Sequence, residues 1–160
     1  MRTADEWFEA YGDSHKNPTN KKIHWICVPL IVFSTIGLFW SIPHAYFSGV
    51  LPGAWEPLLN WGTILITLTL LFYLRMSFTL FLGMLVYSLL CVWGNYALLQ
   101  WDVAPLWLWS AAIFIVMWIG QFIGHKIEGK KPSFFEDIQF LLIGPAWLMH
   151  FLYKKAGIPY

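Results

Sequence analysis

Long stretches without a charged residue constrain the fold of this chain more than any other feature of its sequence. No Asp, Glu, Lys or Arg lies between the members of five pairs of charged residues: Lys22 and Glu56, Glu56 and Arg75, Arg75 and Asp102, Asp102 and Lys126, and Asp137 and Lys154. A helix that crosses a bilayer needs about 20 predominantly apolar residues. The first four stretches are long enough, and they predict spans at residues 24–42, 58–74, 76–99 and 105–124.

The fifth stretch, residues 138–153, is short for a full crossing and contains Gly144-Pro145. Because Pro removes a helix hydrogen bond, we expect a short, broken segment that either crosses at a tilt or turns back near Pro145. Backbone groups in hydrocarbon must pair internally, which favours helices, and no period-two alternation indicates a barrel. The predicted fold class is an all-α, multi-pass membrane helical bundle that forms one domain over residues 1–160.

The composition agrees with a membrane protein and excludes other classes. Hydrophobic residues make up 58% of the chain and charged residues 12%, about half of the roughly 25% found in soluble domains. The same balance excludes a disordered chain. A formal net charge of +1 without a basic patch argues against nucleic acid as a partner. Cys27 and Cys91 lie in apolar runs and are interpreted as small core residues, not as a disulfide or a thiolate metal site.

Residues 1–22 form a polar segment before the first predicted span. Trp7, Phe8 and Tyr11 recur in it at helical spacing, which predicts an amphipathic helix lying on the membrane surface. Lys and Arg occur in this segment, at Arg75 and in the loop after the fourth span, whereas the loops on the opposite face contain none. By the positive-inside rule, we expect the basic face and the N-terminus to be cytoplasmic.

Histidines gather at this predicted cytoplasmic boundary. His15 and His24 lie just before and at the start of the first span, and His125 lies at the end of the fourth. His150 joins them only if the fifth segment turns back, whereas His44 lies on the other face and is interpreted as a wet interfacial side chain. Imidazole is a common ligand for iron, zinc and copper. For any one of these histidines, an interfacial side chain without a ligand is the simpler alternative.

The context of the histidines favours a metal site. Each of the three follows a hydrogen-bonding residue by four positions, in the pairs Tyr11 and His15, Asn20 and His24, and Gln121 and His125. Residues four apart share a helix face, so these side chains could hold the second ring nitrogen, a support that metal sites need. Glu128 could offer a carboxylate to the same metal, or support its ligands as Tyr11, Asn20 and Gln121 would. Equally, Glu128 could form a surface ion pair with Lys126 or Lys131, worth about 0–1 kcal/mol.

Two blocks of the sequence resemble a known membrane family. The first is YGDSHKNPTNKKIHWICVPL, residues 11–30, and the second is WIGQFIGHKIEGKKPS, residues 118–133, followed by LLIGP at residues 141–145. They resemble the 2-hydroxy fatty acid dioxygenase family, formerly known only as a domain of unknown function. In its pattern, Tyr, His, Asn and His precede the first span, and Gln-Phe-Ile-Gly-His is followed by Glu and Pro. Both blocks occur in the family's order and at its span ends.

The resemblance implies an iron(II)-dependent enzyme that uses dioxygen to shorten a 2-hydroxy fatty acid by one carbon, as in fatty acid α-oxidation. It implies His15, His24 and His125 as catalytic iron ligands, with His150 as a candidate for the fourth. The chain departs from the pattern at Ile127, where the family tends to have Phe, and at His150, where it tends to have an acid. A 2-hydroxy acid can chelate iron through its hydroxyl and carboxylate, and the bilayer would deliver its tail to a cleft between helices.

Two other functions stay open on the sequence. A pair of histidines could bind a b-type heme, which would require them to face each other within the membrane. The chain could also be a non-enzymatic lipid-binding protein whose histidines are merely interfacial. The compact loops favour a bacterial inner membrane over the endoplasmic reticulum as its location.

Overall fold

A computed structural model describes residues 2–43, 45–135 and 138–160. Within these ranges the chain contains α-helices and short 3-10 helices and no strand, which confirms the predicted all-α class. The helices are α1 (Ala4–Gly12), α2 (Pro18–Trp40), η1 (Ala45–Phe47), η2 (Gly53–Leu58), α3 (Trp61–Met76), α4 (Phe78–Gln100), α5 (Leu106–Glu128), η3 (Ser133–Phe135) and α6 (Phe140–Ala156). His44, predicted to be interfacial, and Asp137, which borders the fifth uncharged stretch, lie outside the described residues.

Three of the helices have the length and composition of a membrane span. α2, α4 and α5 are each 23 residues long and sufficiently apolar. α3 has 16 residues. At a rise of about 1.5 Å per residue, it is shorter than the roughly 30 Å hydrocarbon core of a bilayer. The fourth full crossing, by α3, therefore stays a prediction, as do the sidedness of the bundle and the position of α1 on the membrane surface.

Local sequence signals set the ends of the helices near the histidines. Asn17 caps α2 by accepting hydrogen bonds from the backbone N–H groups of Thr19 and Asn20, and Pro18 occupies the first helical position. Gly129 ends α5 with a φ of 74°, a left-handed conformation that glycine adopts without strain. The linker before α2 therefore ends, and the loop after α5 starts, at a defined residue.

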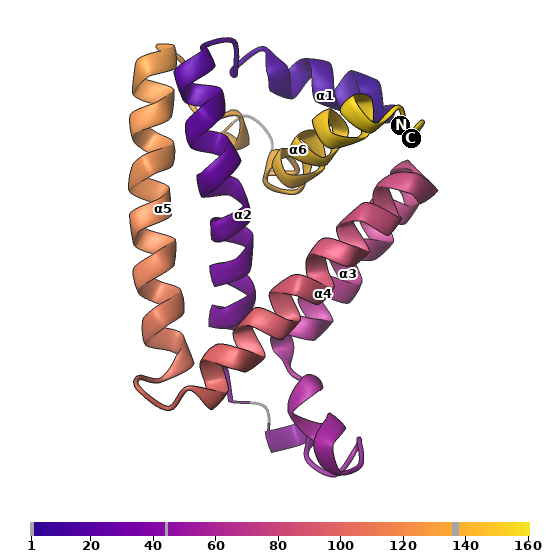
Figure 1. The fold of residues 1–160 in the computed structure, drawn as a ribbon, viewed down its shortest axis with the longest axis vertical. Coiled ribbons are helices and arrows are strands. Elements are labelled where there is room, and N and C mark those ends of the chain that lie inside the picture. Colours follow the sequence, from indigo (N-terminus) through magenta and orange to yellow (C-terminus); the bar gives the residue numbers. More distant parts are fainter. Residues whose placement is uncertain (1, 44, 136–137) are drawn as a thin grey trace.

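Two helix pairs make up the bundle. α2 and α5 run antiparallel and side by side, and α3 and α4 form a second, tilted pair (Figure 1). The first pair packs closely over glycines: a Cβ at Gly37 would lie 2.2 Å from Ser110 Oγ, and a Cβ at Gly124 would lie 2.4 Å from Asn20 Oδ1. Figure 1 shows α1 and α6 across the end of the molecule where α2 starts and α5 ends. There α6 packs against both α1 and the α3–α4 pair and contributes much of the apolar core.

α6 is one continuous helix, so the predicted break at Pro145 is wrong. Pro145 lies in the second turn, where its missing N–H leaves a single carbonyl, that of Leu141, without its usual partner. Tyr73 Oη donates to the neighbouring carbonyl of Leu142 at 2.7 Å and ties this turn to α3. The fifth segment therefore does not turn back, and at 17 residues it is shorter than the three long helices.

Candidate metal centre

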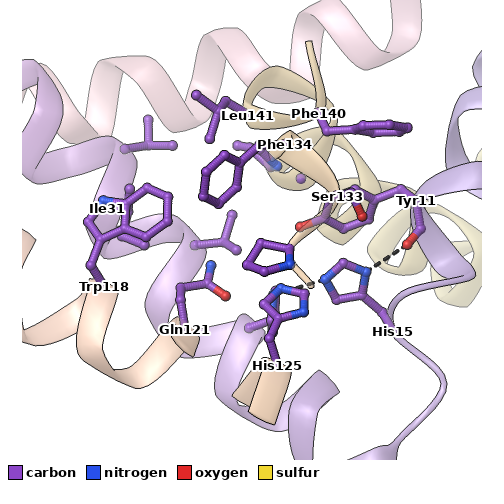
Figure 2. Close-up of a pocket in the computed structure, with 16 residues that line it drawn as sticks. Tyr11, His15, Ile31, Trp118, Gln121, His125, Ser133, Phe134, Phe140 and Leu141 are labelled. Atoms are coloured by element: carbon purple, nitrogen blue, oxygen red, sulfur yellow. Dashed lines mark hydrogen bonds between the residues drawn. The ribbon is translucent and has the colours of Figure 1, made fainter. Parts of the chain in front are cut away.

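Three buried histidines from separate segments meet at one end of the α2–α5 pair. Figure 2 shows two of them, His15 and His125. His15 lies in the linker between α1 and α2, His24 in the second turn of α2, and His125 in the last turn of α5. One ring nitrogen from each lies within 4.8 Å of the others, and the residues are 1%, 1% and 6% exposed. The structure thus brings together the three histidines predicted from the sequence to meet, and their role as metal ligands stays a prediction.

Backbone carbonyls fix the orientation of two of these rings. His15 donates from Nδ1 to the carbonyl of Tyr11 at 2.6 Å, and His24 donates from Nδ1 to the carbonyl of Asn20 at 2.9 Å. Because a carbonyl only accepts, both neutral rings carry their proton on Nδ1 and a lone pair on Nε2. The two Nε2 atoms face each other at 2.9 Å.

Two lone pairs at this distance repel unless a proton or a cation lies between them. Burial lowers the pKa of His15 to about 4, so this ring is neutral near pH 7. Neighbouring imidazole nitrogens that each lie about 2.1 Å from one divalent metal are about 3 Å apart. The Nδ1 atom of His125 is also buried, and no described residue hydrogen-bonds to it. The donor set therefore fits a first-row divalent metal ion.

The residues four positions before the histidines support them differently from the prediction. Tyr11 and Asn20 use their main-chain carbonyls rather than their side chains. The Tyr11 ring instead stacks on His15, with ring centroids 4.1 Å apart. Gln121 lines the cavity beside the histidines, but its Oε1 atom has no hydrogen-bond partner among the described residues.

Glu128 holds the linker that carries His15 against the end of α5. Its carboxylate accepts hydrogen bonds from the backbone N–H groups of Lys16 and Asn17, at 2.8 and 2.9 Å, and from Asn20 Nδ2 at 3.0 Å. Both oxygens are thus engaged by the linker and the start of α2. These contacts differ from a metal ligand and from the partner of a surface lysine, and a role of Glu128 in supporting the metal ligands stays a prediction.

Exposed charges join the same linker to the loop after α5. Lys16 Nζ pairs with Asp13 at 2.9 Å, and Lys130 Nζ donates to the Asp13 carbonyl at 2.9 Å. The hydrogen bond and the charge of Lys16 hold the pKa of the Asp13 carboxyl below its usual range. Exposed contacts of this kind stabilise a fold weakly, whereas two of the three hydrogen bonds of Glu128 are partly buried.

His150 does not join the other histidines, and its prediction as a fourth ligand is corrected by the fold. Its ring lies against Phe8 of α1, with centroids 4.9 Å apart, and its Nδ1 atom pairs with the hydroxyl of Tyr160. The prediction required the fifth segment to turn back. Because α6 is continuous, Trp147 is the α6 residue beside His15, with ring centroids 5.4 Å apart, and His150 lies farther along the helix.

A cavity of about 50 Å³ lies beside the three histidines (Figure 2). Gln121 of α5 and Ser133 of η3 contribute polar groups to its wall. Ser133 was not predicted from the sequence, because it lies in a loop without periodicity. Its place in the second family block was the only signal for it. Trp147 was missed for a related reason, since its contact with His15 depends on how α6 packs.

A larger apolar cavity of about 370 Å³ adjoins the first one, between the two helix pairs. The two cavities share the lining residues Ile31, Val32, Trp118, Leu141 and Pro145. The volume lies within the roughly 300–1,000 Å³ that is typical of small-molecule pockets. The site therefore has a polar end beside the histidines and an apolar continuation along the long helices.

Comparisons with known proteins connect this site to a family. The family described as "Mpo1-like: 2-hydroxy-palmitic acid dioxygenase Mpo1-like" matches residues 1–156. The chain is 29% identical to 2-hydroxy-palmitic acid dioxygenase MPO1 of Saccharomyces cerevisiae over 154 aligned residues. This alignment covers 93% of this chain and 79% of the yeast protein. No solved structure matches. The resemblance seen in the two sequence blocks is confirmed, and the chain belongs to the Mpo1-like, 2-hydroxy-palmitic acid dioxygenase family.

Proposed function

We propose that this protein is an iron(II)-dependent dioxygenase that shortens 2-hydroxy fatty acids by one carbon, with His15, His24 and His125 as the iron ligands. The observation that carries the metal is the pair of Nε2 lone pairs of His15 and His24, which face each other at 2.9 Å. The name of the yeast relative supplies the substrate class and the type of reaction.

His15, His24 and His125 would hold iron(II), which would supply Lewis-acid chemistry for a 2-hydroxy acid and activation of dioxygen. The chain itself provides orientation. The carbonyls of Tyr11 and Asn20 hold two rings in the tautomer that leaves Nε2 free. Residues of η3 and α6 line the cavity beside these rings.

The two adjoining cavities match the two parts of a 2-hydroxy fatty acid. The small cavity beside the histidines has polar side chains for the head, and the larger apolar cavity has room for methylene groups of the tail. A tail in this position lies among the long apolar helices, so the bilayer can supply the substrate directly. The carbon–carbon bond beside the carboxylate would then lie next to the metal ligands.

The geometry argues against a b-type heme held between His15 and His24. Axial nitrogens on opposite sides of one iron lie about 4 Å apart when each is about 2 Å from the metal. The Nε2 atoms of His15 and His24 are closer than this, at 2.9 Å. A cavity of about 50 Å³ is also far smaller than a porphyrin ring.

The test is metal analysis of protein purified without oxygen, followed by oxygen uptake with 2-hydroxyhexadecanoic acid. We expect bound iron and a fatty acid product one carbon shorter that contains labelled oxygen. Hexadecanoic acid lacks one chelating group and should react far more slowly, because positioning supplies much of the rate. Equal turnover of both acids, or turnover that survives iron chelation, would contradict the mechanism. A folded protein that takes up no metal would favour a non-enzymatic lipid-binding role.

A further inference from the structure

Two side-chain oxygen atoms of residues that line the histidine cavity have no hydrogen-bond partner in the described part of the protein. Gln121 and Ser133 both line this cavity (Figure 2), and the residues are 7% and 4% exposed. Neither Gln121 Oε1 nor Ser133 Oγ is hydrogen-bonded to a described residue. Buried polar groups are nearly always paired, because losing water without gaining a partner destabilises the fold. Unpaired groups that border a cavity therefore indicate a ligand with polar groups of its own.

The two side chains suit different ligand groups. A carboxamide oxygen only accepts a hydrogen bond, so Gln121 Oε1 requires an O–H or N–H group. A serine hydroxyl has a proton to donate, so Ser133 Oγ suits a carboxylate oxygen. A 2-hydroxy acid carries both groups on adjacent carbons. We propose that Gln121 binds the 2-hydroxyl group of the substrate and that Ser133 binds its carboxylate, an assignment that rests on the proposed function.

The placement of the tail agrees with this assignment. Trp118 precedes Gln121 by three residues on α5, so the two side chains share a helix face. Trp118 lines both the histidine cavity and the larger apolar cavity, and Leu141 does so from α6. A fatty acid whose hydroxyl contacts Gln121 therefore has its next carbons at the boundary of the two cavities. From there the chain continues into the apolar space.

The test measures equilibrium binding to the metal-free protein in detergent micelles, where chelation by iron contributes nothing. The probes are 2-hydroxyhexadecanoic acid and hexadecanoic acid, each measured by displacement of a radiolabelled fatty acid. We expect the wild-type protein to prefer the hydroxy acid by about tenfold, the scale of one buried hydrogen bond. Gln121→Met should remove this preference. Ser133→Ala should weaken the binding of both acids by about tenfold and leave the preference unchanged.

Ser110→Ala is the matched control. Ser110 Oγ is also buried without a described partner, but it lies near the opposite end of α5, against Gly37. This variant should change neither affinity. The assignment would be overturned by equal binding of both acids to the wild-type protein, which needs no variant to fold. It would also be overturned by a hydroxyl preference that persists in Gln121→Met, or by equal effects of Ser110→Ala and Ser133→Ala.

The affinity for Co(II) distinguishes substrate binding by Gln121 from a role in orienting His125. If Gln121 only orients His125, Gln121→Met should lower the affinity for Co(II) and keep the hydroxyl preference, which would overturn the assignment. If the iron-loaded wild-type protein turns over no 2-hydroxy acid, the proposed function is wrong. A hydroxyl preference that depends on Gln121 would still support the binding assignment in that case.

Discussion

The two ends of the α2–α5 pair orient buried polar side chains in the same way. At the end away from the histidines, Asn95 Nδ2 donates to the carbonyls of Phe33 and Cys91, at 3.2 and 2.9 Å. Cys91 precedes Asn95 by four residues, which is the spacing at which two of the histidines at the other end reach their carbonyls. Both ends therefore use a main-chain carbonyl one turn away to fix a side chain.

The ends differ in whether unpaired polar atoms border a cavity as well as a closely packed glycine. Asn95 Oδ1 and Ser110 Oγ lie against Gly37, where an added Cβ would be 2.3 and 2.2 Å from them. The backbone of α2 thus packs directly against both atoms. At the histidine end, Asn20 Oδ1 lies against Gly124 in the same way, but Gln121 Oε1 and Ser133 Oγ border a cavity. Unpaired polar atoms against a glycine indicate close helix packing, whereas unpaired polar atoms around a cavity indicate a ligand site.

The largest effect is expected from replacing one of the three histidines at the histidine end. His24→Ala should lower metal affinity by more than about 100-fold and abolish activity, because a ligand matters more than the groups that support it. Helix content by circular dichroism should not change. His150→Ala is the control and should keep its metal, since His150 lies apart from the other histidines. Full iron occupancy in the His24→Ala protein, by metal analysis, would rule out the site.

The next effect concerns how the histidine end is held together. In the wild-type protein the backbone N–H groups of Lys16 and Asn17 each donate to a different oxygen of Glu128. Glu128→Gln replaces one of these oxygens by an NH₂ group, which cannot accept, so at least one hydrogen bond to the linker is lost. We expect metal affinity to fall by about 10- to 100-fold, measured by Co(II) titration. Glu56→Gln is the matched control, because Glu56 also accepts a backbone N–H, from Gly49 at 3.1 Å, but far from the histidines. Equal losses in the two variants would contradict a specific role for Glu128.

The meeting of the histidines could be predicted from the sequence for a simple reason. Charged residues mark the ends of apolar helices, and successive antiparallel helices bring alternate ends to the same face. His15, His24 and His125 all lie at ends of this kind. The path of α6 could not be predicted in the same way, because the effect of Pro145 depends on contacts from elsewhere, such as the hydrogen bond that Tyr73 makes across 69 residues.

The finer details of the site also depend on long-range partners. Sequence spacing correctly paired Asn20 with His24. The Asn20 side chain, however, donates to Glu128, 108 residues away, and it is the main-chain carbonyl of Asn20 that holds the His24 ring. Ser133 lies in a loop, where no periodicity marks which residues are buried. Spacing thus identifies the helix face that two residues share, and it does not identify the distant group that competes for a side chain.

Two glycine substitutions compare the ends directly. Gly37→Ala and Gly124→Ala each place a Cβ at 2.2–2.4 Å from a polar atom of a neighbouring side chain. Each should lower the free energy of unfolding by about 1–3 kcal/mol, as overpacking does. Only Gly124→Ala should also weaken metal binding, because the displaced atom belongs to Asn20, whose carbonyl orients His24. Thermal unfolding and Co(II) titration measure the two effects. A similar loss of metal affinity in Gly37→Ala would show that the ends are not independent.

The smallest expected effect is the dependence of stability on pH. Burial lowers the pKa of His15 from 6.5 to about 4, so between these values the unfolded chain binds more protons than the folded one, and stability rises with pH. Acidification should therefore destabilise the metal-free protein, by about 1 kcal/mol over the first pH unit below the unfolded value. Denaturant unfolding of the wild-type protein and of His15→Asn measures this slope, which the variant should reduce. An equal slope of unfolding free energy against pH in both proteins would mean that His15 is protonated readily in the folded state. In that case a proton shared by the Nε2 atoms of His15 and His24 could take the place of a cation.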